Sequence, residues 1–126
     1  MPKTKKFSIL VADDEPDVVE YLSRYLKRNL DCNIFEAKDG REALEVYKNN
    51  HLDLILLDLK MPGLNGIDVI REIRKTDHDT LILVITAWDA EKIAHQAIQE
   101  GATDLLSKPL SPKAIKLKIE TILNRK

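Results

Sequence analysis

Two groups of acidic side chains stand where apolar runs of the chain end. Asp13, Asp14 and Glu15 follow one such run, and Asp58 follows another. Carboxylates held close together repel one another unless one is protonated or a cation lies between them. Mg²⁺ prefers oxygen ligands, commonly one or two carboxylates together with water and phosphate oxygens. If the fold brings the two runs together, the sequence predicts a magnesium site.

Thr86 and Lys108 supply hydrogen-bond donors, in contrast to the carboxylate acceptors. Thr86 follows a third apolar run, and Lys108 lies just beyond a fourth. A hydroxyl and an ammonium near a bound cation would stabilise the charge that develops on a phosphoryl group during transfer. Asp58 is the carboxylate central to this set, so it is the candidate nucleophile.

The hydropathy pattern predicts the elements that would bring these residues together. Short runs rich in Ile, Leu and Val are expected to form strands at 6–12, 33–36, 52–57, 81–85 and 103–106. The stretches between and after them carry apolar residues three and four positions apart, which predicts five amphipathic helices. Strict alternation with short connections predicts an α/β fold, with helices on both faces of a parallel sheet.

Residues that favour helix ends agree with this division. Pro16 suits the first turn of a helix, Gly101 suits a C-cap, and Ser111-Pro112 suits an N-cap followed by the first helical residue. Helices are therefore expected to begin near residues 16 and 112, and one is expected to end near residue 101.

Composition also predicts the order of the strands. The runs FSILVA, LDLILL and LILVIT are apolar almost throughout, as strands covered on both faces must be. The second and fifth runs are shorter and more polar, which places them at the edges. The expected sheet is doubly wound with order 2-1-3-4-5, and ligands bind such sheets at the switch point between strands 1 and 3.

Each candidate residue has a simpler explanation when it is taken alone. Asp58 could cap a helix, Asp13 and Asp14 could lie at a solvated helix N-terminus, Thr86 could be an N-cap, and Lys108 could be a solvated charge. All of them are expected at one end of one sheet, beyond the carboxyl ends of its strands. Their joint placement favours a shared site.

The sequence resembles the receiver domain of two-component response regulators over nearly its whole length. The similarity lies in ILVADDEPD, LILLDLKMPGLNGIDVI, LVITAW and GATDLLSKPLSPKAI. The resemblance implies the flavodoxin-like receiver fold and Asp58 as phosphoacceptor. It also implies that Asp14, Asp58 and the backbone carbonyl of Lys60 coordinate Mg²⁺, with Asp13 acting mainly through water.

The same resemblance implies roles for the remaining residues and for partners. Thr86 and Lys108 would each contact a phosphoryl oxygen. The donor would be a phosphohistidine on a histidine kinase or histidine phosphotransfer protein. Phosphorylation would change the surface of the fourth helix, fifth strand and fifth helix to control a downstream protein or output domain, and it could also drive dimerisation. The chain would be a switch rather than an enzyme, limited to self-catalysed phosphotransfer and autodephosphorylation.

Three positions bear on how such a switch would perform. Receivers commonly carry an aromatic residue where this chain has Leu105, so the usual coupling to the surface is in question. Lys60 and Trp88 occupy positions that tune acyl-phosphate lifetime in the family. Because both side chains are large, we expect slow autodephosphorylation, measurable as a longer acyl-phosphate half-life than in a variant with small residues there.

Composition limits the setting and the partners. The 126 residues fit one domain, expected to be a receiver over 1–126, and 20 Lys and Arg against 21 Asp and Glu give a net charge of -1. That balance gives no electrostatic reason to expect direct nucleic-acid or membrane binding. Cys32 is the only cysteine, and a reducing, cytoplasmic location fits best.

Two alternatives of other classes stay open at this point. A receiver-like scaffold that binds partners without phosphorylation would explain Leu105. An aspartyl-phosphate hydrolase is less favoured, because the position where its general acid would stand is Lys60. A nucleotide-binding module is disfavoured too, since neither GxxxxGK[ST] nor GxGxxG occurs and the first turn is acidic.

Overall fold

A computed structural model describes residues 6–61, 64–86, 91–108 and 111–124 of the chain. Its strands are β1 (Phe7–Ala12), β2 (Cys32–Ala37), β3 (Leu54–Asp58), β4 (Leu81–Thr86) and β5 (Asp104–Ser107). Its helices are α1 (Pro16–Asn29), α2 (Gly40–Asn49), α3 (Gly66–Arg74), α4 (Glu91–Glu100) and α5 (Pro112–Leu123). None of these helices is long and apolar enough to cross a membrane. The predicted alternation of strand and helix is confirmed.

All strand pairs of the sheet are parallel, and the order is β2-β1-β3-β4-β5. The order predicted from strand composition is therefore confirmed. Every residue of β3 is buried, as expected for a central strand covered on both faces. The edge strands β2 and β5 include exposed and half-buried positions, because their outer sides have no neighbouring strand.

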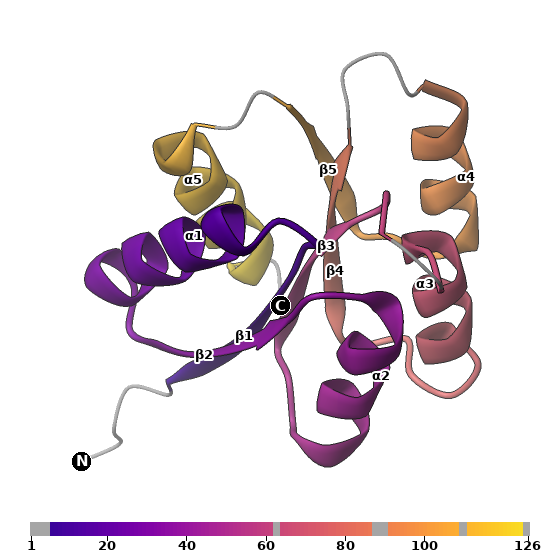
Figure 1. Cartoon of the computed structure of the whole chain (residues 1–126), viewed down its shortest axis with the longest axis horizontal. Helices are drawn as coiled ribbons and strands as arrows, with labels where there is room; N and C mark the ends of the chain where they lie inside the picture. The colour runs from indigo at the N-terminus through magenta and orange to yellow at the C-terminus, as the bar shows by residue number, and fades with distance from the viewer. Residues whose placement is uncertain (1–5, 62–63, 87–90, 109–110, 125–126) are drawn as a thin grey trace.

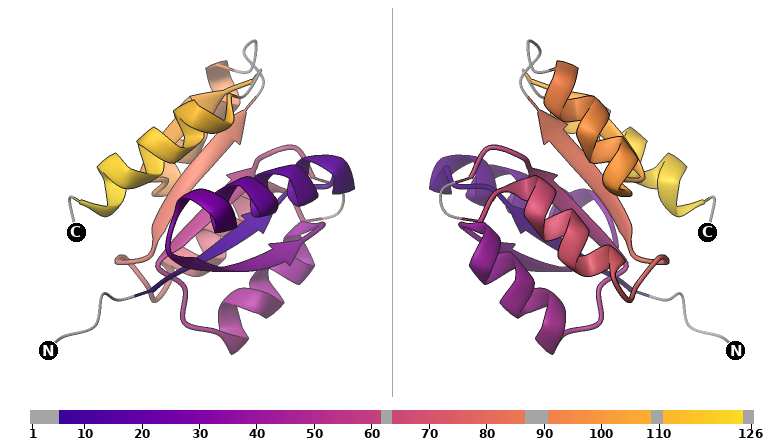
Figure 2. Two further views of the ribbon diagram at one scale, coloured as in Figure 1. Left: turned by 90° about the vertical axis from the view of Figure 1, so that its left-hand side faces the viewer. Right: turned by 90° about the vertical axis from the view of Figure 1, so that its right-hand side faces the viewer.

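Helices cover both faces of the sheet, α1 and α5 on one side and α2, α3 and α4 on the other (Figure 1). Each face has its own apolar core. The core under α1 and α5 includes Leu26, Leu56 and Ile119. The core under the other three helices includes Ile55 and Ile70. The side views show the two helical layers separated by the twisted sheet (Figure 2).

The predicted helix ends are confirmed. Pro16 lies in the first turn of α1. Gly101 follows α4 with a φ of 120°, a left-handed conformation that favours glycine. The Ser111 side chain accepts a hydrogen bond from the Ala114 amide at 3.4 Å and so caps α5.

Strand boundaries differ from the hydropathy pattern at both ends of β3. The strand begins at Leu54 and ends at Asp58, whereas the apolar run predicted 52–57. Asp58 still pairs with Ile85, and the Leu59 amide donates to the Ile85 carbonyl at 3.2 Å. Backbone pairing rather than side-chain polarity defines a strand end, so β3 includes its terminal aspartate.

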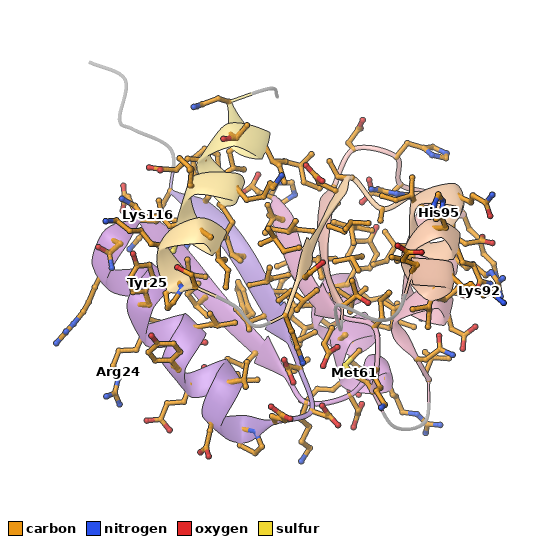
Figure 3. All side chains as sticks on the ribbon, turned by 90° about the horizontal axis from the view of Figure 1, so that it is seen from above. Arg24, Tyr25, Met61, Lys92, His95 and Lys116 are labelled. Carbon is orange, nitrogen blue, oxygen red and sulfur yellow. The ribbon has the colours of Figure 1, made fainter. Side chains whose placement is uncertain are left out.

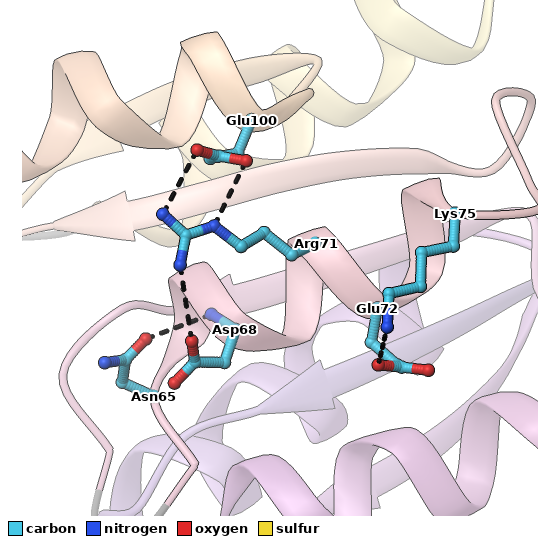
Figure 4. Close-up of polar contacts among 6 residues, drawn as sticks. All are labelled: Asn65, Asp68, Arg71, Glu72, Lys75 and Glu100. Carbon is cyan, nitrogen blue, oxygen red and sulfur yellow. Dashed lines mark hydrogen bonds and ion pairs between the residues drawn. The ribbon is translucent and has the colours of Figure 1, made fainter.

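Helix α4 is packed lightly and is held at its C-terminal end by two arginines of α3. Its one buried residue is Ala97, and Lys92 and His95 project away from the sheet (Figure 3). Arg71 reaches both oxygens of Glu100 at 3.2 Å, and it also lies 3.7 Å from Asp68 (Figure 4). We refer to Arg71 and Arg74 together as the arginine clamp.

The second arginine of the clamp binds backbone. Arg74 Nε donates to the Gly101 carbonyl at 2.9 Å, and its Nη1 donates to the Asp77 carbonyl at 3.0 Å. One side chain thus fixes the end of α4 to the loop that follows α3.

Candidate functional site

Three carboxylates meet at the carboxyl end of the sheet. Each of Asp13, Asp14 and Asp58 has an oxygen within 4.8 Å of an oxygen of the other two. They come together because β1 and β3 are adjacent and parallel, so the residues that end one strand lie beside those that end the other. Asp13 and Asp58 are buried, whereas Asp14 is exposed. The structure therefore brings together the acidic residues that the sequence placed at this end.

Asp13 is held by its neighbours but keeps one unsatisfied oxygen. Its Oδ1 accepts the Glu15 amide at 3.0 Å, and its own amide donates to the Ala37 carbonyl at 3.1 Å. Its Oδ2 is buried and has no hydrogen-bond partner among the described residues. Burial raises the pKa of Asp13 to about 6, the Glu15 amide opposes this, and the negative charge of Asp58 adds to it.

The group of Asp13, Asp14 and Asp58, which we call the acidic pocket, fits a hard divalent cation. A bound cation would satisfy the orphaned Asp13 Oδ2 and would favour the ionised form of that carboxyl. The donors are oxygen atoms only, which suits Mg²⁺ rather than a soft metal. The chemistry of this donor set is therefore consistent with the magnesium site predicted from sequence.

A cationic side chain contacts Asp58. Lys108 Nζ is 3.4 Å from Asp58 Oδ2, and the Lys60 amide donates to Asp58 Oδ1 at 3.1 Å. Burial lowers the pKa of Lys108, but the negative charges of Asp58 and Asp13 outweigh burial and raise it. Both oxygens of Asp58 thus have a partner, an ammonium at one and a backbone amide at the other.

Thr86 stands at the same end of the sheet. It is the last residue of β4 and is only 4% exposed. Because Asp58 pairs with Ile85 across the neighbouring strands, Thr86 lies one residue beyond Asp58 along the strand direction. Its carbonyl accepts the Lys108 amide at 2.8 Å, which joins the segments that carry the two residues.

Leu105 lies on the face of the sheet that α4 covers. It is half-buried in β5 and packs against the core under α2, α3 and α4. Four other sequence positions of interest, Pro62, Gly63, Trp88 and Pro109, lie outside the described residues.

Hydrogen bonds with backbone groups fix Asp13 and Asp58, and residue types alone could not have predicted them. The Glu15 amide and the Ala37 carbonyl fix Asp13 through groups that every residue carries. The Lys60 amide does the same for Asp58. Only the strand register, which places these segments side by side, reveals them.

Taken together, the arrangement can hold a cation and an anion side by side. The acidic pocket would attract the cation, and Lys108 would attract the anion. Asp58 belongs to the acidic pocket and is also the carboxylate that Lys108 contacts. Such an arrangement suits the transfer of a phosphoryl group to a carboxylate, in which charge develops on the phosphoryl oxygens.

Comparison with known protein families agrees with this geometry. The family model described as the response regulator receiver domain matches residues 9–120. The chain belongs to the response-regulator receiver family. Receivers are signalling switches activated by phosphorylation and are generally not enzymes. They normally use Mg²⁺ at an acidic pocket of this kind. The scaffold and hydrolase alternatives are not favoured by these similarities.

Relatives with response-regulator names match almost the whole chain. The transcriptional regulatory protein ResD of Bacillus subtilis is 39% identical over 99% of this chain and 51% of its own length. The alkaline phosphatase synthesis transcriptional regulatory protein PhoP of the same organism is 37% identical over 93% of this chain and 48% of its own. The chain thus spans about half the length of these curated relatives.

Solved structures agree at the level of the fold. The receiver domain of the Francisella response regulator 1452 has a TM-score of 0.87 and 28% identity, covering 95% of this chain and 98% of that one. A receiver domain from Clostridium thermocellum has a TM-score of 0.86 and 30% identity, covering 94% and 95%. The flavodoxin-like receiver fold expected from sequence is confirmed.

Proposed function

We propose that this receiver, expected to span residues 1–126, accepts a phosphoryl group on Asp58 in a Mg²⁺-dependent reaction. The observation that carries the proposal is the place of Asp58, which has an oxygen within 4.8 Å of oxygens of Asp13 and Asp14 and lies 3.4 Å from Lys108 Nζ. Asp58 is also the one member of the acidic group that Lys108 contacts through a hydrogen bond.

The proposed donor is a phosphohistidine on a histidine kinase or histidine phosphotransfer protein. An oxygen of Asp58 would form a bond to phosphorus while the bond from phosphorus to the histidine nitrogen breaks. The released imidazole takes a proton from solvent. The donor and acceptor atoms balance without any further reactant, so no residue of this chain has to act as a general acid.

The neighbouring residues would stabilise the transferred group. Asp14, Asp58 and the Lys60 carbonyl would hold Mg²⁺, with Asp13 acting mainly through water. The ion supplies charge neutralisation at the phosphoryl oxygens when it is bound. The Lys108 ammonium would pair with one phosphoryl oxygen, and the Thr86 hydroxyl would donate to another.

The proposed output is a change in the surface formed by α4, β5 and α5. A ligand shifts a conformational equilibrium only by binding one state better than the other, and a phosphoryl group that engages Thr86 and Lys108 would do so. The partner would be a downstream protein or an output domain, and a phosphorylation-dependent dimer is part of the proposal. The proposal does not include direct binding of nucleic acid by this domain. We expect the domain to act in the cytoplasm.

Incubation with acetyl phosphate or BeF₃⁻, with and without Mg²⁺, tests the proposal. Wild-type protein should be labelled only with Mg²⁺, and Asp58→Asn should not be labelled at all. Asp53→Asn is a matched control, because Asp53 is also a buried aspartate but lies just before the other end of β3. Labelling that survives Asp58→Asn, or that proceeds fully without Mg²⁺, would overturn the proposal.

A further inference from the structure

The loop between β3 and α3 positions Asp58 and Lys60. Two hydrogen bonds fix its ends, one from the Leu59 amide to the Ile85 carbonyl at 3.2 Å and one from the Gly66 amide to the Leu59 carbonyl at 3.1 Å. The Lys60 amide also donates to Asp58 Oδ1 at 3.1 Å. A displacement of Leu64 and Gly66 would therefore reach Leu59 through this Gly66–Leu59 bond, and with it the neighbouring Asp58 and Lys60.

The far side of the same loop rests on α2 at Gly40. A Cβ built on Gly40 would overlap the Leu64 carbonyl oxygen, and it would lie 2.8 Å from the Leu64 carbonyl carbon and 3.0 Å from Leu64 Cβ. Two of these three atoms belong to the backbone, so rotation of a side chain cannot relieve the overlap. Any residue larger than glycine at position 40 must push Leu64 away.

Backbone conformation does not account for a glycine at this position. The φ of Gly40 lies outside the left-handed range, which among the described residues only Gly101 adopts. Glycine is also a poor helix former, less favourable than alanine by about 1 kcal/mol in a helix interior. Gly40 is nevertheless the first residue of α2. Close approach of the Leu64 backbone is the feature of the structure that requires it.

The start of α2 is itself fixed, so it can serve as a support. Asp39 caps the helix by accepting the Glu42 amide at 2.8 Å, and its carbonyl accepts the Ala43 amide at 3.0 Å. Ala37, at the end of the preceding strand, accepts the Asp13 amide at 3.1 Å. The segment that carries Gly40 is thus tied both to its own helix and to the acidic pocket.

We propose that Gly40 is a positioning residue for the site, acting through the Leu64 backbone to hold the β3–α3 loop in place. The inference rests on the function proposed above, since it assigns Gly40 to the support of the Lys60 carbonyl and the Asp58 carboxylate. Groups that support a metal ligand typically change metal affinity 10- to 100-fold when they are altered. We therefore expect Gly40→Ala to weaken Mg²⁺ binding by about tenfold.

Titration calorimetry with Mg²⁺ alone, combined with amide hydrogen exchange of the metal-free protein, tests this proposal. Gly40→Ala should raise the dissociation constant of Mg²⁺ and speed exchange at the hydrogen-bonded amides of Lys60 and Gly66. Gly101→Ala is the matched control, because its positive φ and the approach of Arg74 Cγ to within 2.8 Å of an added Cβ also destabilise the fold. Gly101 lies at the opposite end of the sheet, so this variant should bind Mg²⁺ as the wild type does.

The outcomes separate the two proposals. Equal Mg²⁺ affinity in Gly40→Ala and Gly101→Ala would overturn the role of Gly40, whether both match the wild type or both are weakened alike. Wild-type protein that binds no Mg²⁺, or Asp58→Asn that is still labelled, would overturn the proposed function instead. If Gly40→Ala is unfolded in buffer, the three proteins are compared in trimethylamine N-oxide, which favours the compact state.

Discussion

Two buried aspartates a few ångströms apart have different surroundings at the candidate site. Both oxygens of Asp58 have partners, Lys108 Nζ at 3.4 Å and the Lys60 amide at 3.1 Å. Asp13 has one oxygen bound to the Glu15 amide and one buried without a partner among the described residues. The unpartnered oxygen of Asp13 is suited to binding a cation. The fixed orientation of the Asp58 carboxylate is suited to nucleophilic attack.

Replacement of Lys108 should separate cation binding from phosphoryl transfer. Lys108→Met removes a positive charge beside the acidic pocket, so we expect Mg²⁺ to bind more tightly, by about tenfold at most after screening by solvent. Labelling of Asp58 by acetyl phosphate should fall, because no ammonium remains to pair with the phosphoryl group. Calorimetry and a labelling assay measure the two effects, and Lys113→Met, an exposed lysine of α5, is the control. Weaker Mg²⁺ binding in Lys108→Met would contradict this assignment of charges.

A second polar cluster, distant from the candidate site, has a structural role. The Asp77 carboxylate accepts hydrogen bonds from the Tyr47 hydroxyl at 2.6 Å, the Thr80 hydroxyl at 2.6 Å, and the amides of Asp79 and Thr80. Burial raises the pKa of Asp77, but the Thr80 and Tyr47 hydrogen bonds and the two amides outweigh it and hold that pKa well below its usual range. Burial and the bond to Asp77 raise the pKa of Tyr47 to about 12.

The lowered pKa of Asp77 makes its contribution to stability dependent on pH. An aspartate titrates near pH 4 in an unfolded chain, so the ionised Asp77 contributes fully above that pH and loses its effect as pH falls toward its folded-state pKa. Asp77→Asn should lower the free energy of unfolding at pH 7 by about 1 to 2 kcal/mol. The difference from wild type should shrink below pH 4. Urea unfolding at several pH values measures this difference in the free energy of unfolding, and Asp79→Asn, at an exposed aspartate, is the control. A difference between Asp77→Asn and wild type that grows as the pH falls would contradict the prediction.

At the scale of the elements, the sequence predicted the order of the strands, which depends on side-chain polarity. It did not predict contacts between backbone groups of distant segments. The order of strands followed from β1, β3 and β4 being apolar and β2 and β5 being more polar. The convergence of Asp13 with Asp58 followed from that order. Contacts such as Leu64 with Gly40, or Arg74 with Gly101, join segments distant along the chain and involve carbonyl groups that no residue type reveals.

The arginine clamp predicts that α4 is anchored at its C-terminal end. Arg74→Ala removes two hydrogen bonds from a charged donor to backbone carbonyls, at 2.9 and 3.0 Å, and should lower the free energy of unfolding by about 2 kcal/mol. Amide exchange near Gly101 should become faster. Lys75→Ala is the control, since Lys75, just after α3, forms an exposed ion pair with Glu72 and no other among the described residues (Figure 4). Exposed pairs contribute little, so Lys75→Ala should leave exchange at Gly101 unchanged. Equal effects of the two substitutions would show that the clamp does not anchor α4.

Over the whole molecule, the sheet separates two cores and carries the candidate site at one end. The core on one side contains residues of α1 and α5, and the core on the other contains residues of α2, α3 and α4. The central strand β3 contributes buried residues to both, and Asp58 ends that strand. The residue proposed to accept the phosphoryl group therefore sits at the end of a strand that is buried along its whole length, which suits a precisely oriented nucleophile.

Helix α4 contributes a single buried residue to this packing, and its sparse burial bears on how such chains diverge. Ala97 is the one residue of α4 that is buried, so most of its other positions can change identity at little cost to folding. Mutations there are free to accumulate without first requiring compensation in the core. On the output surface proposed above, such changes would alter which partner binds this helix, while the acidic pocket and the sheet beneath it stay the same. After duplication of its gene, two copies of such a chain would come to bind different partners through substitutions on the exposed side of α4 alone.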